Sequence, residues 1–348
     1  MGTLWFCLVA GTLAMYVVLD GFDIGAGIIH LFVARTDEER RLVIRSIGPV
    51  WDGNEVWLLA AGGTLFFAFP ALYASSFSGF YLPLMMVLWL LILRGTSVEF
   101  RNHLGSEIWA TFWDGIFAFS GLLLAAFYGA ALGNVVRGVP LDPGGRFFEP
   151  LWTSFLPAAN TGVLDWYTIL VSVAALAALA LHGALWVALK TEGPVNRRAL
   201  DAANRAAAAV AVLTALVTAA TYWLRPALFA NFSAHPWGVV FPVLPLAGLL
   251  GVYWFLSRRA ERAAFLSSCV YLLGMLTSLA FSLYPRVLPS SLNPDFALTV
   301  ENSKAGAHGL RVGVAWWLIG MALAAAYATY TYRNFSGKVK LPPADETY

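Results

Sequence analysis

Long apolar stretches recur along this chain of 348 residues, and they decide what it can fold into. A helix that crosses a bilayer needs about 20 mostly apolar residues, because the membrane interior offers no water to satisfy free backbone groups. We count nine such stretches and expect each to be a transmembrane helix. Their approximate bounds are residues 4–33, 53–73, 77–98, 110–135, 162–189, 203–224, 238–256, 263–284 and 312–332.

The composition agrees with a membrane protein. Hydrophobic residues make up 59% of the chain and charged residues 12%, whereas soluble domains have about 45–50% apolar residues, glycine included, and about 25% charged residues. The net charge of +2 provides no field for nucleic-acid binding. The two cysteines, Cys7 and Cys269, lie in apolar stretches and offer neither a disulfide framework nor a metal site. The sequence therefore predicts an all-α integral membrane protein with about nine transmembrane helices.

The distribution of positive charge predicts the orientation of the chain. Cytoplasmic loops retain Lys and Arg, and one side of the nine predicted spans carries 16 of these residues and the other side 6, out of 22. We therefore expect the amino terminus outside and the carboxyl terminus in the cytoplasm. An odd number of helices agrees with termini on opposite sides of the membrane.

A polar segment near the middle of the chain predicts a division of the helices. Residues 190–202 include Gly193 and Pro194, and we interpret them as a polar hinge. We expect a first helical bundle in residues 1–190, with helices one to five, and a second bundle in residues 191–348, with helices six to nine. No tandem repeat is visible, so any internal symmetry would have to be structural.

Acidic residues inside the predicted spans are the strongest functional signal. A charge at bilayer depth costs at least about 2.5–3.5 kcal/mol, so such residues usually face a bundle interior and often mark an ion or proton route. Asp20 and Asp23 lie three residues apart and share one face of the first helix. Beside them, Gly21 and Gly25 form a small-xxx-small pair that lets another backbone approach closely.

The next three helices add four more acids. Asp52 and Glu55 share a face at the start of the second helix, Glu99 ends the third, and Asp114 lies one turn into the fourth. In the predicted orientation, all six acids fall in the cytoplasmic half or near the midplane. We predict a polar track that relays protons from the cytoplasm along Asp20, Asp23, Asp52, Glu55, Glu99 and Asp114. The residues expected to support this track are Trp51, Asn54, Trp57, Arg94 and Arg101.

A structural interpretation of the same acids stays open. They are also compatible with a buried hydrogen-bonded network, or with ion pairs to Arg94 and Arg101, that only fixes helix packing. Glu99 is compatible with an interfacial residue paired with Arg94. Asp114 is compatible with a carboxylate that complements the positive end of a helix dipole.

The histidines give only a weak signal for a cofactor. Of the five, only His182 lies well inside a predicted span. A b-type haem held by two histidines needs a pair at matched depth on facing helices. No Ser-His-Asp, Cys-His or metal-ligand spacing is present, so we expect this chain to bind no haem or metal by itself.

Two of the acidic stretches form a distinctive pattern. They are Asp20-Gly21-Phe22-Asp23-Ile24-Gly25-Ala26-Gly27 and Gly48-Pro49-Val50-Trp51-Asp52-Gly53-Asn54-Glu55-Val56-Trp57-Leu58. Together with residues 77–81, 133–140 and 284–291, they resemble subunit II of the cytochrome bd-type quinol oxidases. The resemblance covers nearly the whole chain.

The resemblance implies an architecture and a partner. The expected fold has two four-helix bundles plus one peripheral helix, in a heterodimer with subunit I in the bacterial cytoplasmic (inner) membrane. In that family subunit I carries the b-type and d-type haems, so this chain is expected to bind none of them. A structural quinone or lipid in this chain and small accessory membrane subunits are compatible with the resemblance.

The resemblance also implies a function. The complex oxidises quinol and reduces O2 to water, and subunit II helps to conduct cytoplasmic protons to the oxygen-reducing site. On this match Asp52 corresponds to the buried acid of the proton channel, and Glu99 lies near its entrance. Residues 20, 23 and 114 align with further acids of the family pattern.

Two other functions remain as alternatives. A proton-coupled secondary transporter predicts inverted repeats and helices broken by Gly or Pro in both halves, whereas the acids here are confined to the first half. A purely structural anchor for an enzyme subunit predicts the same sequence features, and it differs only in its response to mutation.

The orientation can be tested with reporter fusions. A reporter that is active only in the cytoplasm is expected to give a signal when fused to Tyr348 and when inserted after Gly193, since both lie on the side that holds 16 of the Lys and Arg residues. The control insertion after Gly144, in a predicted outer connection, is expected to be silent. Silence from either of the first two fusions, in protein shown to be inserted, would contradict the orientation.

Overall fold

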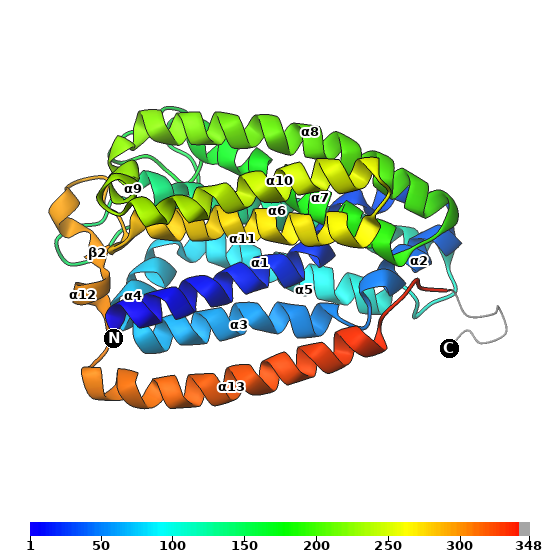
Figure 1. Ribbon diagram of the computed structural model, residues 1–348, viewed down its shortest axis with the longest axis horizontal. Helices are drawn as coiled ribbons and strands as arrows, with labels where there is room; N and C mark the ends of the chain where they lie inside the picture. Colours follow the sequence, from blue (N-terminus) through cyan, green and yellow to red (C-terminus); the bar gives the residue numbers. More distant parts are fainter. Residues whose placement is uncertain (341–348) are drawn as a thin grey trace.

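The computed structural model describes residues 1–340, which form a bundle of long helices running along one axis (Figure 1). A small antiparallel hairpin lies at the end of the bundle that also holds α9 and α12 (Figure 1). The helices are α1 (Gly2–Val33), α2 (Asp37–Ile47), α3 (Trp51–Ala68), α4 (Pro70–Gly79), α5 (Tyr81–Phe100), α6 (Glu107–Arg137), α7 (Trp166–Lys190), α8 (Gly193–Leu224), α9 (Ala230–Ala234), α10 (Val240–Ser257), α11 (Glu261–Leu283), α12 (Val300–Ser303) and α13 (Ala307–Asn334). The hairpin strands are β1 (Arg286–Leu288) and β2 (Leu298–Thr299).

Within residues 1–340, eight helical segments are long and apolar enough to cross a membrane, which confirms the predicted all-α membrane class. They are α1, α5, α6, α7, α8, α11, α13 and the segment Pro236–Ser257, which includes α10. The predicted second span is not among them. Its helix α3 has Asp52 and Glu55 near its start, and it ends at Ala68 before Pro70 begins α4. Because α3 packs along α1 (Figure 1), a ninth crossing through α3 stays a prediction.

The prediction of a polar hinge over residues 190–202 is wrong for most of these residues, because they form the start of a helix. Helix α8 begins at Gly193, three residues after α7 ends at Lys190. Pro194 fits the first helical turn, where a backbone N–H has no helical partner, and an alanine-rich sequence follows it. Small residues then form a buried stripe on α8, namely Ala199, Ala203 and Ala207. The division of the chain at residue 190 into two bundles stays a prediction.

The sequence did not predict α2, which lies in the connection between the first two spans. Its start is fixed by a capping box, in which the Thr36 side chain accepts from the Glu39 N–H and the Glu39 side chain accepts in return. Its apolar face is buried and its other face is charged. The helix thereby places Asp37 and Arg40 close to the ends of the long helices.

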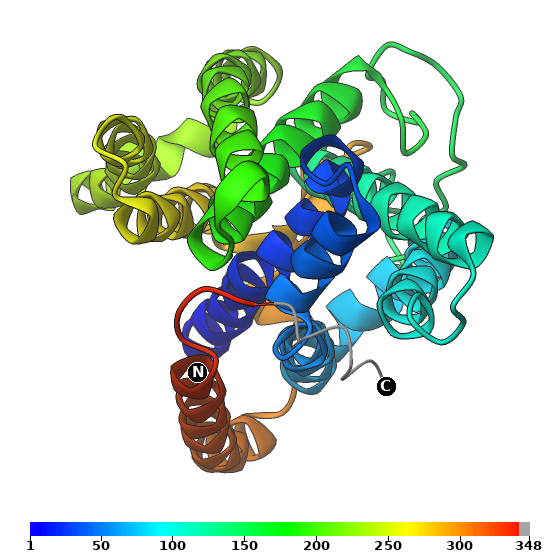
Figure 2. The same ribbon diagram turned by 90° about the vertical axis from the view of Figure 1, so that its right-hand side faces the viewer.

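Helix α1 lies inside the bundle and packs against α3, α6, α7 and α11 (Figure 2). Glycines allow the contact with α7, because a side chain at Gly25 or at Gly183 would collide with the backbone of the other helix. The close approach predicted for the pair Gly21 and Gly25 is thus confirmed at Gly25. Helix α7 therefore covers the side of α1 that holds Gly25. The side chains of Asp20 and Asp23 bind residues of α5 and α3 instead.

Helix α13 lies at the edge of the bundle (Figure 2). Leu310 is the only buried residue within its bounds. Beyond its end, Lys338 forms an ion pair with Glu261, and the Lys190 side chain donates to the Phe335 carbonyl. The chain therefore fastens this helix mainly at its ends.

Replacing Gly25 with valine is expected to destabilise the protein. Overpacking a filled interior typically costs about 1–3 kcal/mol, so we expect the midpoint of thermal unfolding in detergent, followed by tryptophan fluorescence, to fall by several degrees. The control is Gly11→Val in the same helix, where an added Cβ meets no atom within 4 Å. Equal midpoints for the two variants would show that the α1–α7 contact does not need Gly25.

Candidate functional site

Arg94 joins three helices inside the bundle. Its side chain is buried on α5, where Nη1 donates to Asp20 Oδ1 of α1 at 2.5 Å and Nη2 donates to Glu55 Oε2 of α3 at 2.8 Å. Asp20 is fully buried, and the Glu55 side chain is 24% exposed. The structure thus brings two of the predicted acids onto one cation, which is the arrangement that a buried charge requires.

Asp23 lies near this cluster but binds a neutral partner. Asn54 Nδ2 donates to Asp23 Oδ2 at 2.7 Å, and the Tyr332 hydroxyl of α13 donates to Asn54 Oδ1 at 2.8 Å. Asp23 and Asn54 are both buried. Among the described residues, Oδ1 of Asp23 has no hydrogen-bond partner.

Asp114 is the centre of a separate ionic cluster at the end of the bundle where α2 lies. Arg101 donates to its carboxylate through Nε at 2.6 Å and through Nη2 at 3.0 Å. His30 Nε2 lies 2.8 Å and Arg40 Nη1 3.4 Å from the same carboxylate. Arg101 also binds Asp37 of α2 at 2.8 Å. Asp114 therefore does more than complement a helix dipole, because side chains of three other segments converge on it.

Asp52 and Glu99 lie on the surface of this chain. Both are exposed, and neither side chain makes an ion pair or hydrogen bond with another residue in the described range 1–340. The resemblance implies a buried acid at position 52, so burial there would have to come from another chain. The predicted alternative pairing of Glu99 with Arg94 is wrong, since Arg94 binds Asp20 and Glu55.

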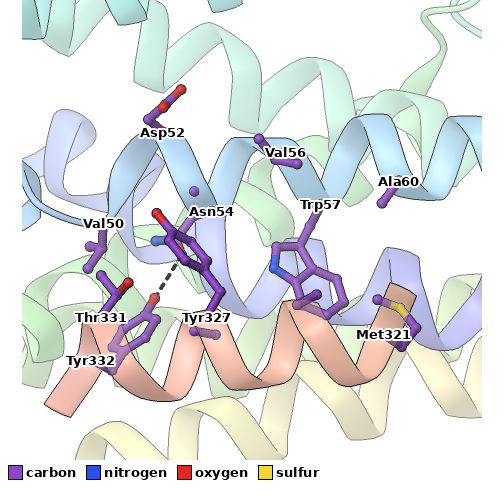
Figure 3. Close-up of a pocket in the computed structure, with 13 residues that line it drawn as sticks. Val50, Asp52, Asn54, Val56, Trp57, Ala60, Met321, Tyr327, Thr331 and Tyr332 are labelled. Carbon is purple, nitrogen blue, oxygen red and sulfur yellow. Dashed lines mark hydrogen bonds between the residues drawn. The ribbon is translucent and has the colours of Figure 1, made fainter. Parts of the chain in front are cut away.

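A groove of about 270 Å³ runs between α3 and α13 (Figure 3). Figure 3 shows its polar residues at one end and Trp57 and Met321 towards the other. The lining residues with polar side chains at this end are Asp52, Asn54, Tyr327, Thr331 and Tyr332. Of the predicted supporting residues, Asn54 and Trp57 thus line the groove. Trp51 packs instead against Gly95 of α5, with its ring 3.4 Å from the position of an added Cβ.

His182 is held by protein atoms on both ring nitrogens. Nδ1 lies 2.7 Å from Ser268 Oγ, and Nε2 lies 2.9 Å from the Val18 carbonyl oxygen. Within residues 1–340, no group of three His, Cys, Asp or Glu side chains is placed to hold a metal ion. That this chain binds no haem by itself stays a prediction.

Comparison with known proteins shows which family the chain belongs to. A family model described as cytochrome bd terminal oxidase subunit II matches residues 1–335. The chain belongs to this family. It is 31% identical over 366 residues to the probable cytochrome oxidase subunit 2 of Haemophilus influenzae, covering 97% of this chain and 94% of that protein. It is 32% identical over 314 residues to cytochrome bd ubiquinol oxidase subunit 2 of Bacillus subtilis, covering 89% and 88%.

The fold agrees with membership of the cytochrome bd subunit II family. The bd oxidase from Geobacillus thermodenitrificans has a solved structure in which one chain matches with a TM-score of 0.71 and 18% identity. The match covers 96% of this chain and 98% of that chain. The resemblance seen in the sequence is thereby confirmed, and the chain is a subunit of an oxidoreductase complex.

Sequence reasoning missed a third buried ionic cluster in this cytochrome bd subunit II chain. At the end of α6, Arg137 forms ion pairs with Glu149, at 2.8 Å, and with Asp165. Asp165 also caps α7, where its side chain accepts from two backbone N–H groups. The Asp165-x-x-Thr168 spacing before an apolar run could have revealed the cap. Nothing local in the sequence links Glu149 to Arg137.

The environment of Glu149 predicts a pH-dependent stability. Burial raises the pKa of Glu149 from its ordinary 4.5 to about 7, although Arg137 opposes the shift. Between these two pH values the folded chain keeps a proton that the unfolded chain releases. The folded state therefore loses stability as the pH rises from 4.5 to 7, by about 3 kcal/mol at most.

Glu149→Gln is expected to remove this dependence. The wild-type midpoint of thermal unfolding should fall between pH 5 and pH 8, and the variant midpoint should change less over the same range. Asp142→Asn serves as the control, because Asp142 lies in the same connection with its side chain 38% exposed, and its backbone contacts lower its pKa, so it does not titrate in this range. Parallel pH curves for wild type and Glu149→Gln would contradict the assignment.

Proposed function

We propose that this cytochrome bd subunit II chain pairs with a haem-bearing subunit I in a bacterial cytoplasmic membrane. The complex oxidises quinol and reduces O2 to water, with the b-type and d-type haems in subunit I. The relatives named as subunits of ubiquinol oxidases in Bacillus subtilis and Escherichia coli support this substrate class. The amino terminus lies outside and the carboxyl terminus in the cytoplasm. The family match gives no support to a proton-coupled secondary transporter.

Within this complex we assign to the chain the conduction of protons from the cytoplasm towards the oxygen-reducing site. The observation that carries the assignment is an imbalance of charge inside the bundle. Asp20 and Glu55 both bind the guanidinium of Arg94, whereas Asp23, three residues from Asp20 on the same helix, binds only the neutral Asn54 among the described residues. A buried carboxyl without a cation is favoured in its neutral form, so such a cluster can hold a proton and exchange it.

The two exposed acids provide the connection to the cytoplasm. Trp51 packs against Gly95 and so brings the start of α3 beside the end of α5. Asp52 and Glu99 belong to these two helix ends, and both are exposed. We infer that protons enter at Glu99 and Asp52, pass through the partly exposed Glu55, and reach the buried carboxyls. All of these residues lie in the first proposed bundle, residues 1–190.

Asp114 takes a different part in this scheme. Its contacts with Arg101, Arg40 and His30 satisfy the carboxylate from several sides. Protonation of a carboxylate that cations hold in this way costs much free energy, because it leaves the buried cations without a charged partner. We therefore propose that Asp114 and Arg101 order the cytoplasmic end of the route rather than carry its protons.

The proposed function predicts the effect of Asp52→Asn. Asparagine keeps the shape of the side chain but removes the titrating group, so the haem content of the purified complex should survive while O2 consumption per haem falls by about tenfold or more. Asp52→Glu is expected to retain part of the activity. The measurement is O2 consumption per haem across pH in the purified complex.

The control for this experiment is Asp201→Asn. Asp201 is an exposed acid of α8 on the same predicted side of the membrane, so its removal should leave turnover per haem unchanged. If Asp52 only supports assembly, haem content and activity should decline together in Asp52→Asn. Normal turnover per haem at every pH would exclude Asp52 from the proton route.

A further inference from the structure

Asp23 depends on one neighbour for its hydrogen bonding. The carboxyl is fully buried, its Oδ2 accepts from Asn54 Nδ2 at 2.7 Å, and its Oδ1 has no partner among the described residues. A buried polar group without partners costs free energy. The orientation of the Asn54 amide therefore decides how Asp23 is stabilised.

The Asn54 amide has two unlike ends. Its N–H groups stabilise an ionised carboxylate, whereas its carbonyl oxygen accepts a hydrogen bond only from a protonated acid. In the structure the Tyr332 hydroxyl donates to Asn54 Oδ1 at 2.8 Å, as the dashed line in Figure 3 shows. A hydroxyl can also accept, but the Tyr332 hydroxyl makes no other hydrogen bond among the described residues, so its proton has a partner only while it donates to Asn54 Oδ1. This favours the orientation with the carbonyl end on α13 and the N–H end towards Asp23.

We propose that Tyr332 is a positioning residue for Asp23. By holding the Asn54 amide in one orientation, its hydroxyl favours the ionised form of the Asp23 carboxyl and so promotes release of the proton. The relevance of this contact to proton conduction rests on the proposed function. The proposal assigns a role to α13, a helix that carries none of the predicted acids.

The groove between α3 and α13 connects this contact with the surface. Tyr332 and Asn54 line its polar end together with the exposed Asp52 (Figure 3). Asn54 therefore lies between the groove and the buried carboxyl of Asp23.

Replacing Tyr332 changes the identity of none of the other ionisable groups around Asp23 and its neighbours Asp20, Glu55 and Tyr332. They come from several helices, and none of them binds Tyr332 through a hydrogen bond in the described part of the chain. They are Tyr16 and Asp20 on α1, Asp52 and Glu55 on α3, Arg94 on α5, Tyr128 on α6, His182 on α7 and Cys269 on α11.

The test follows the Asp23 carboxyl by infrared spectroscopy in the purified complex. The carbonyl band that disappears in Asp23→Asn identifies the protonated acid, and its loss with rising pH gives a titration midpoint. In Tyr332→Phe the freed amide can turn its carbonyl oxygen to the protonated acid. We therefore expect the midpoint to rise by about one pH unit, which corresponds to about 1.4 kcal/mol.

Tyr330→Phe is the matched control, because Tyr330 lies two residues away on α13 and its side chain is 69% exposed. It should leave the midpoint unchanged. Only assembled complex with full haem content is compared, and Tyr332→Met replaces Tyr332→Phe if the latter fails to assemble. An unchanged or lowered midpoint in the Tyr332 variant, or no titrating Asp23 band in any complex, overturns the proposal.

O2 consumption per haem separates this proposal from the proposed function. A raised midpoint in Tyr332→Phe together with lost turnover in Asp23→Asn supports both. A raised midpoint together with normal turnover in Asp23→Asn supports the positioning role of Tyr332 and removes Asp23 from the proton route.

Discussion

Arg94 carries a permanent charge between α1, α3 and α5, where water cannot solvate it. Its two carboxylate partners make that position tolerable, and removing one partner of a buried pair typically costs about 3–5 kcal/mol. Helix α3 depends on this contact more than its neighbours do, since its first turns hold Asp52, Asn54 and Glu55 and are too polar to favour the bilayer alone. Glu55 and Asn54 bind residues of α5 and α1, and these contacts hold α3 in the bundle.

A second arginine with two buried carboxylate partners, Arg137, lies at the end of α6 and has a different role. Arg137 also binds two carboxylates, but both come from the connection between α6 and α7. Glu149 lies within this connection, and Asp165 is its last residue. That cluster ties a long connection to the helix ends. The Arg94 cluster instead joins helices to one another, and its Glu55 side chain keeps some exposure.

The sequence was sufficient for the fold class and for most helix bounds because long apolar runs have few alternatives in a membrane. It also identified the acids that meet at Arg94, since Asp20 and Glu55 are costly residues in such runs. It did not show that Asp52 faces outwards, because helical spacing fixes which residues share a face but not which neighbour that face meets. Tyr332 was not predicted, since a tyrosine near a helix end usually reads as an interface anchor. Glu149 was missed because its partner lies twelve residues away across an irregular connection.

Helix α13 has one buried residue and is fastened mainly at its ends, yet it supplies the hydroxyl that reaches Asn54. Most of its other side chains are exposed, and the core places little constraint on their size or shape. Changes at these exposed positions would therefore alter the surface that the helix presents without repacking the interior. The position of Tyr332 is the exception, because a change there alters a hydrogen bond that ends on a buried acid.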